Sequence, residues 1–227
     1  MTRFMGFSTE GLQFLQELSA EQNRDWFTAH RQTYDTTLQG PMIDLVLDLT
    51  EELARREVPL RGDPKRNVFR IHRDVRFSKD KAPYKTHIGA TLTADGSKLS
   101  FGALYIHIDP KGSFAACGFY RPEPADLDAL RQAMTGDPKG WDRIEKALAR
   151  SGLPIDPDET ALKRVPRGFE AVTDPGSQDM LKRRSWIVSR PLSPSMIATP
   201  ALVGEIASFA EAALPLLRFG LEATGRD

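Results

Sequence analysis

The stretch FRIHRDVRFSKDKAPYKTHIGA, residues 69–90, marks the change from helical to extended chain and carries an unusual charge. From position 61 to position 90 the sequence holds nine Lys or Arg and three Asp, whereas the whole chain of 227 residues has a formal net charge of zero. At its start, apolar residues recur at every second position, which is the spacing of a strand with one buried face. The stretch therefore predicts both the beginning of a sheet and a local anion-binding surface.

Four segments in and after this stretch alternate apolar and polar residues, as half-buried strands do. They are VFRIHRDV from Val68, HIGATLTAD from His87, GALYIHID from Gly102 and SFAACGFY from Ser113, and SWIVSR at 185–190 is a further candidate. The short connections between them favour hairpins over crossover helices. We therefore expect a largely antiparallel sheet of about four to six strands.

Helical spacing is found before and after the predicted strands. Ser8 is expected to cap a first helix, and the capping-box sequence SAEQ at 19–22 to begin a second helix that ends near Gly40. Further helices are expected to begin near Pro41, Pro124, Pro138 and Thr199–Pro200, the last with a bend near Pro215. The predicted fold class is α+β, a single domain over residues 1–227 with its sheet packed against N-terminal, middle and C-terminal helices.

The composition is that of an ordinary soluble globular protein, with 40% apolar and 27% charged residues. No apolar run approaches the ~20 residues needed to cross a bilayer, and the first residues lack the apolar core of a secretory signal. The single cysteine, Cys117, fits a reducing compartment and is expected to be a buried filler. We therefore expect a cytoplasmic protein with no membrane partner.

The predicted strands place three of the four histidines, His72, His87 and His107, on one sheet face, where each is a candidate general acid or base. The loop that follows the first strand adds cations and hydroxyls, the donors that phosphate or carboxylate recognition requires. We expect this sheet face and loop to bind a small anionic ligand. The candidate ligand-binding residues are Arg70, Arg73, Asp74, Arg76, Lys81, Tyr84, Lys85 and Arg121.

The same charges have other interpretations. Arg73 can pair with an acidic residue from a helix, and Arg76 can pair with Asp74 or Asp80. Lysines beside strands can serve only to discourage edge-to-edge association. A second basic cluster, Lys182, Arg183, Arg184 and Arg190, makes a nucleic-acid-binding module the first alternative. A protein-interaction module without chemistry is another. Enzymatic activity and oligomeric state stay open.

No metal and no cofactor is predicted. His72, His87 and His107, with Asp109, include metal-ligand types, but none of the histidines forms an HxH or HExxH arrangement. No glycine-rich nucleotide-binding loop is present, and the aromatic residues near position 30 have the helical spacing of a core rather than of a stacking platform.

Four stretches resemble an uncharacterised bacterial and fungal family called domain of unknown function 2461. They are NRDWFTAHRQTY, FRIHRDVRFSKDKAPYKTHIGA, YIHIDPKGSFAACGFYRPEP and SWIVSRPL. The resemblance runs from Phe7 to Leu217, and its long RDxRFSxDKxPYKTHIG block is specific. It implies one domain over the full length and implies no activity. Where many relatives are Gly-rich this chain has FAACGFYRPEP, so the resemblance assigns no role to Cys117.

Overall fold

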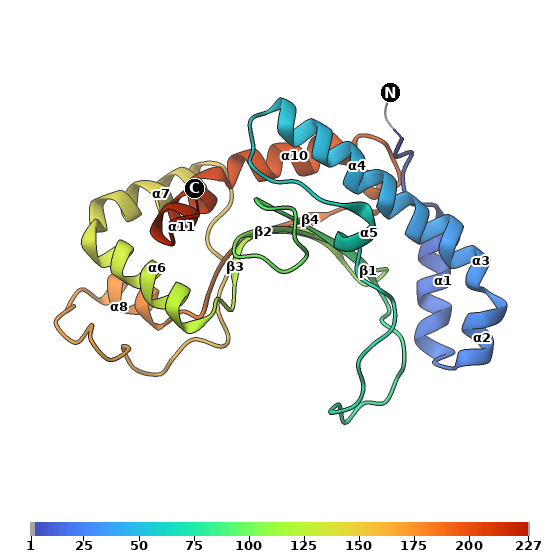
Figure 1. Ribbon diagram of the computed structural model, residues 1–227, viewed down its shortest axis with the longest axis horizontal. Coiled ribbons are helices and arrows are strands. Elements are labelled where there is room, and N and C mark those ends of the chain that lie inside the picture. The colour runs from blue at the N-terminus through green and yellow to red at the C-terminus, as the bar shows by residue number, and fades with distance from the viewer. Residues whose placement is uncertain (1–2, 227) are drawn as a thin grey trace. The chain divides into compact units, whose positions relative to one another are not determined.

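A computed structural model describes residues 3–226 and shows an α+β fold with one four-stranded antiparallel sheet (Figure 1). The strands lie in the order β1-β2-β3-β4. Their bounds are Ile88–Thr93 for β1, Ala103–Ile108 for β2, Ser113–Tyr120 for β3 and Ser185–Leu192 for β4. The predicted fold class and the antiparallel sheet are confirmed.

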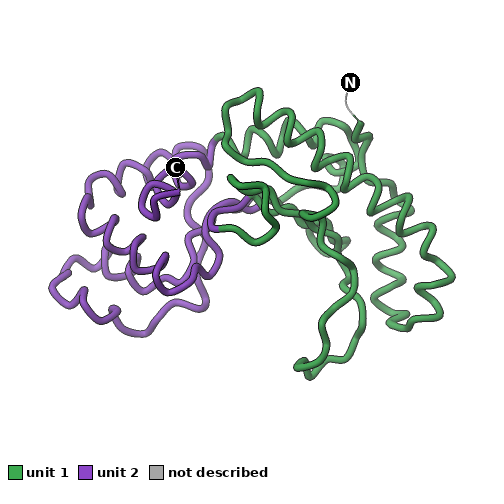
Figure 2. Tube along the Cα trace, viewed as in Figure 1, with its two compact units in different colours: residues 1–100, 104–115, 190–211 green, residues 101–103, 116–189, 212–227 purple. Residues whose placement is uncertain are grey.

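The chain divides into two compact units (Figure 2). Unit 1 comprises residues 1–100, 104–115 and 190–211, and unit 2 comprises residues 101–103, 116–189 and 212–227. Strand β3 contributes residues to both units, and so does β4. The expectation of a single domain stays a prediction.

The first two helices of unit 1 begin at side-chain caps. The Ser8 hydroxyl accepts the Gly11 amide at 3.1 Å and begins α1 (Thr9–Ala20), as predicted. The second helix, α2 (Arg24–Ala29), is capped by Asn23, whose side chain accepts the Trp26 amide at 2.8 Å. The prediction that Ser19 caps this helix is wrong, because Ser19 lies inside α1 and its hydroxyl donates to the Gln16 carbonyl.

The helical chain then continues through Gly40, where the sequence predicted an end. After α3 (Arg31–Tyr34) comes one π-helical turn, η1 (Asp35–Gln39), which runs directly into α4 (Gly40–Arg55). The Gly40 amide donates to the carbonyl of Asp35, five residues earlier, and Pro41 has no amide hydrogen to donate. A wider turn therefore absorbs the proline without ending the helix.

Helix α4 covers the apolar side of β1. Its inward face consists of Met42, Leu45, Val46, Leu49 and Leu53, all with no exposed surface. The matching face of β1 is formed by Ile88, Ala90 and Leu92. Arg56 joins α4 to α10 (Leu202–Ala212), since its guanidinium binds Glu52 at 2.6 Å and Glu211 at 3.0 Å. These contacts leave the opposite side of β1 and β2 for polar residues.

The predicted strand at 68–75 does not form. After α5 (Pro64–Asn67), residues 68–87 make a long loop that extends from the start of β1 (Figure 1). It is held by two isolated bridges, Val68 to Ala90 and His72 to Tyr84. The loop folds back on itself, and the Arg73 amide donates to the Pro83 carbonyl at 2.8 Å. Because Pro83 has no amide hydrogen to continue a ladder, alternation in the sequence did not produce a strand.

Two helices of unit 2 begin where proline predicted them. Helix α6 (Pro124–Gly136) and α7 (Pro138–Arg150) have proline in the first turn, and Asp137 caps α7 by accepting the Gly140 amide at 2.8 Å. The sequence predicted an irregular surface connection over residues 153–178. Helix α8 (Pro175–Lys182) begins inside this range, so the connection is shorter than predicted.

The end of the chain differs in detail from its prediction. The predicted last helix is two helices, because α10 ends at Ala212 and α11 (Leu214–Ala223) begins with Pro215 in its first turn. The short helix α9 (Pro194–Ile197) precedes them. Among the described residues, no helix combines the length and the apolar character that crossing a bilayer requires.

Candidate functional site

Polar residues gather on the side of β1 and β2 that faces away from α4. In β2, Leu104, Ile106 and Ile108 are buried, and the residues between them are half-buried on the other face. Those residues are Tyr105 and His107, and Asp109 follows directly after the strand. His87 stands just before β1, the neighbouring strand. We call His87, Tyr105, His107 and Asp109 the polar face.

Three ligand-type side chains of the polar face converge. The rings of His87 and His107 have centroids 4.3 Å apart, and His107 Nε2 lies 3.6 Å from Asp109 Oδ2. One nitrogen of each ring and one carboxylate oxygen all lie within 4.8 Å of one another. These three residues could hold a metal ion, which the sequence did not predict.

The His107 ring is held from two further directions. The Tyr105 hydroxyl lies 3.0 Å from His107 Nδ1, and the Phe114 ring stacks on the imidazole with centroids 4.7 Å apart. Gly89 makes room for the tyrosine, because a Cβ at position 89 would come within 2.9 Å of its hydroxyl. The orientation of His107 is therefore determined by three neighbouring strands.

Burial keeps both imidazoles of the polar face neutral near pH 7. Burial first, and then the neighbouring His107 and Lys85, together lower the pKa of His87 to about 4 against an opposing effect of Asp109. Burial also lowers the pKa of His107, although Asp109 opposes that change. Neutral imidazoles can accept a proton or bind a metal, whereas imidazolium cannot.

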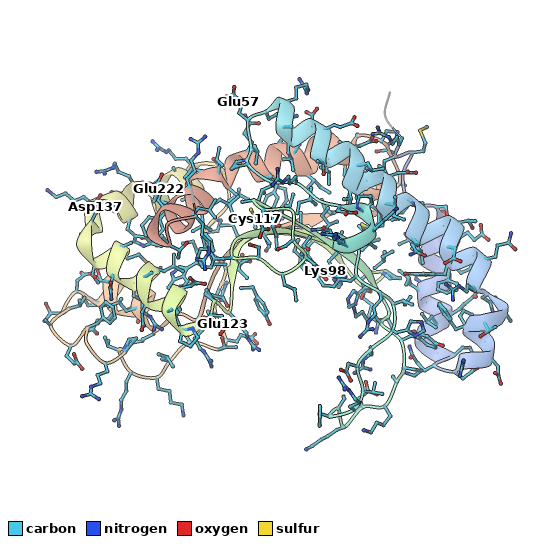
Figure 3. The ribbon with its side chains drawn as sticks, viewed as in Figure 1. Glu57, Lys98, Cys117, Glu123, Asp137 and Glu222 are labelled. Atoms are coloured by element: carbon cyan, nitrogen blue, oxygen red, sulfur yellow. The ribbon has the colours of Figure 1, made fainter. Side chains whose placement is uncertain are left out.

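A cluster of cations lies beside the polar face, since the Phe69 ring that the cations approach packs edge-to-face on Tyr105 with centroids 6.0 Å apart. The ammonium groups of Lys85 and Lys98 lie 5.3 Å and 4.4 Å from the centroid of the Phe69 ring (Figure 3 labels Lys98). Lys85 Nζ donates to the Arg70 carbonyl at 2.9 Å, and Lys98 Nζ donates to the Val68 carbonyl at 2.8 Å. We call Lys85, Lys98 and Arg70 the lysine cluster.

The lysine cluster has no acidic partner within 4.0 Å among residues 3–226. Burial lowers the pKa of Lys85, and the charges of Lys98 and Arg70 lower it further. The pKa of Lys98 is lowered by burial and then by Arg70. The two lysines are therefore partly desolvated and are repelled by each other or by the exposed Arg70, and no acidic side chain neutralises their charge among the described residues.

At the tip of the loop, residues 73–82, oppositely charged side chains pair with one another. We call these residues the loop tip. Arg73 binds Asp80 at 2.6 Å, and Arg76 binds Asp74 at 2.7 Å. The Arg76 guanidinium lowers the pKa of Asp74, and Lys81 donates to the carbonyl of Val75. Three of the residues predicted to bind a ligand, Arg73, Asp74 and Arg76, thus form ion pairs within the loop. The structural interpretation of the sequence anticipated Asp74 as the partner of Arg76, but it expected a helix residue as the partner of Arg73.

His72 and Tyr84 belong to a different environment from His87 and His107. The Tyr84 ring is buried and stacks on Phe27 with centroids 4.5 Å apart. The His72 ring lies against the same two aromatic rings. The prediction that three histidines share one sheet face is therefore right for two of them and wrong for His72, because the strand that was to position it is a loop.

The remaining predicted cations lie elsewhere in the chain. Arg121 belongs to unit 2 and lies over the ring of its neighbour Tyr120. Three residues of the second basic cluster are bound within the protein: Lys182 to Asp179, Arg183 to the Asp156 carbonyl and Arg190 to Glu205. Most side chains of this second basic cluster therefore bind acidic side chains or a backbone carbonyl of the protein itself.

Sequence reasoning missed Lys98 and Phe69 as members of the site. Lys98 lies in the turn between β1 and β2, thirteen positions after Lys85, and no local pattern connects the two. Only the register of the neighbouring segments brings both ammonium groups to one phenyl ring. The uneven charge of residues 61–90 was the available signal, and it identified Arg70 and Lys85 but not Lys98, which lies outside that range.

Comparison with known families gives one match. The model of a family described as "Conserved hypothetical protein (DUF2461)" matches residues 10–219. No curated protein and no solved structure matches the chain.

Proposed function

Because the chain belongs to the conserved hypothetical protein family DUF2461, a description that names no activity, we propose its function from the site alone. The protein binds a small anionic ligand, bearing phosphate or carboxylate, at the lysine cluster beside the polar face. One observation carries this proposal: Lys85 and Lys98 approach the same phenyl ring, and neither has an acidic partner within residues 3–226.

The ammonium groups of Lys85 and Lys98 are held in place by the protein, and each keeps N–H donors that the protein does not use. Each ammonium has three N–H groups and gives one to a backbone carbonyl, that of Arg70 or of Val68. Two donors on each nitrogen remain for a ligand. Because the carbonyl bonds and the Phe69 ring already fix the nitrogens, little side-chain entropy is lost when an anion binds.

The electrostatics favour an anion for the same reason that the lysine pKa values are lowered. Burial and the neighbouring cations disfavour the charged form of each lysine. A phosphate or carboxylate between them would relieve this repulsion and stabilise the charged form. The single cysteine fits a reducing compartment, and the net charge of zero argues against attraction of nucleic acid to the whole surface. Both features agree with a cytoplasmic metabolite as the ligand.

The cations that this proposal assigns to the ligand site are not the same as those that the sequence predicted. The loop-tip residues Arg73 and Arg76 are neutralised by Asp80 and Asp74, so their charge is less available to a ligand. The lysine cluster at the base of the loop takes their place. His87 and His107 lie on the neighbouring polar face, where they could contact a bound ligand.

Thermal stabilisation by inorganic phosphate, pyrophosphate and citrate tests the proposal. A double variant, Lys85→Met with Lys98→Met, keeps the alkyl stems that pack on Phe69 and removes both charges. We expect at least one of the three anions to stabilise the parent protein and to lose that effect in the double variant. The matched control, Lys79→Met with Lys81→Met in the loop tip, should keep the effect. Equal stabilisation of parent and double variant, or no stabilisation by any of the three anions, would refute the proposal.

Short oligonucleotides separate this function from a nucleic-acid-binding module. A small ligand held by two or three cations should show a shallow dependence of log K on log salt, whereas an oligonucleotide that contacts many phosphates shows a steep one. We expect no oligonucleotide binding at physiological salt, because most of the second basic cluster is already paired. Tight oligonucleotide binding with a steep salt slope would replace the small anion by nucleic acid.

A further inference from the structure

We propose that His87, His107 and Asp109 form a binding site for a divalent first-row transition-metal ion, for which Zn²⁺ is the probe. Two imidazoles and one carboxylate are a ligand set that transition metals accept. The three ligand atoms lie within 4.8 Å of one another. With three protein ligands, such a site leaves at least one coordination position open to water or to a further ligand.

The distance between His107 and Asp109 supports a shared ion over a direct hydrogen bond. Nε2 and Oδ2 are 3.6 Å apart, which is beyond the 2.7–3.2 Å range of ordinary hydrogen bonds. Two ligands at about 2.0–2.2 Å from a tetrahedral ion are about 3.3–3.6 Å apart. The pair thus already has the spacing of two ligands on one metal.

The other atoms of these two residues are occupied in the way that metal ligands usually are. Asp109 Oδ1 accepts the Lys111 amide at 2.8 Å, which leaves Oδ2 to face the imidazole. The Tyr105 hydroxyl holds His107 Nδ1 at 3.0 Å, which leaves Nε2 to face the carboxylate. Such partners fix the orientation of a ligand and the tautomer of an imidazole.

Burial and packing also suit a small ion. The side chains of His107 and Asp109 are 15% and 14% exposed, so little water competes with them, and the His107 ring is fixed against Phe114. The position of His87 is set by the start of β1, and its ring lies beside that of His107. Small rotations of these side chains would close the remaining separations, by about 1 Å, to the ligand spacing of a zinc ion.

Titration of the metal-free protein with Zn²⁺, in competition with a chromophoric chelator, tests this site. We expect one ion per chain and a loss of affinity of at least about 100-fold in each of His87→Gln, His107→Gln and Asp109→Asn. Tyr105→Phe should lose about 10-fold, because it removes only the orienting partner of a ligand. No saturable binding, or unchanged affinity in the three ligand variants, would overturn the proposal.

The chain provides a matched control in His72. This histidine is exposed, its ring lies against Phe27 and Tyr84, and it is not part of the group of three converging ligand atoms, so His72→Gln should bind zinc like the parent. A loss in His72→Gln equal to that of the ligand variants would show adventitious binding by surface histidines and would overturn the site.

X-ray absorption of the zinc-loaded parent protein gives a second readout that needs no variant to fold. We expect scattering from two imidazoles, oxygen ligands, and no sulfur, since the sole cysteine is buried in β3. A sulfur shell, or fewer than two imidazoles, would contradict the assignment.

The metal site and the anion site can fail separately, because their residues differ. The Lys85→Met and Lys98→Met double variant should still bind zinc, and the zinc titration requires no anion. Loss of zinc from that double variant would contradict the assignment of the ion to His87, His107 and Asp109 alone.

Discussion

At the scale of single residues, a buried carboxylate anchors the start of unit 1. Asp48 is 6% exposed, and its Oδ2 accepts the amides of Arg3 at 2.7 Å and Phe4 at 2.8 Å. Its Oδ1 binds the Arg3 guanidinium at 3.0 Å. The side chain of α4 therefore satisfies backbone donors that the first residues of the chain would otherwise bury without partners.

Replacing this carboxylate should destabilise the protein. We expect Asp48→Ala to lower the free energy of unfolding by about 2–3 kcal/mol, because two amides lose a charged acceptor. Urea denaturation measures the loss. Asp44→Ala, on the same helix and with a side chain only half-buried, is the control and should change stability by less than about 0.5 kcal/mol. Equal effects of the two substitutions would contradict this role of Asp48.

The thiol of Cys117 should be inert in the folded protein. Burial raises its pKa to about 12, so it stays protonated at pH values where a free thiol ionises. Because the folded pKa is the higher one, the thiol's contribution to stability is complete below about pH 9 and is lost as the pH rises toward 12.

Alkylation with iodoacetamide measures this directly. We expect negligible labelling of the native protein between about pH 7 and pH 9, and rapid labelling once urea unfolds the chain. Native labelling that rises steeply with pH, as for a free thiol, would show that Cys117 is exposed and reactive.

At the scale of elements, one glycine controls how β3 meets β4. Gly118 has a φ of +135°, and a Cβ at this position would collide with the carbonyl oxygen of Trp186 on β4. A side chain there would therefore both strain the backbone of β3 and push the neighbouring strand away.

Substitution of this glycine should weaken the sheet. We expect Gly118→Ala to lower the free energy of unfolding by at least about 2 kcal/mol, through backbone strain and overpacking together. Gly112→Ala, in the turn between β2 and β3, is the control, since no heavy atom lies within 4 Å of its added Cβ. A thermal midpoint for Gly118→Ala that equals that of the control would rule out the close approach.

At the scale of the whole molecule, the chain passes between the two compact units at residues 100, 103, 115, 189 and 211. Three of these passages fall within or next to strands of the single four-stranded sheet. Units that share strands differ from domains joined by a linker, because neither unit is a continuous piece of chain.

We therefore expect one cooperative thermal transition. Scanning calorimetry should give equal calorimetric and van't Hoff enthalpies, and Asp48→Ala, a substitution in unit 1, should shift the whole transition. Two resolved transitions, only one of which moves in Asp48→Ala, would show that the units unfold independently and that the single-domain prediction is wrong.

Local chemistry made much of this fold predictable. The Ser8 and Asp137 caps, the prolines that begin α6 and α7, and the alternation in β2 each depend on residues close together in sequence. The sequence also located the charged region at 61–90 and placed His87, His107 and Asp109 on one sheet face, together with His72, which the structure places elsewhere. These features were predictable because their causes, side-chain caps and strand periodicity, act over a few residues.

Patterns within the amino-acid sequence thus predicted the fold class, the starts of α1, α6 and α7, and the charged region of the candidate site. The tertiary structure decided that residues 68–87 form a loop, that helix continues through Gly40, and that Arg73 and Arg76 pair within the loop while Lys85 and Lys98 do not. The physical reason is that pairing register and charge neutralisation are settled between segments distant in sequence. Which strands pair, and which charges pair, depends on the segments that lie nearby in the folded protein, and a pattern within one short segment does not specify those neighbours.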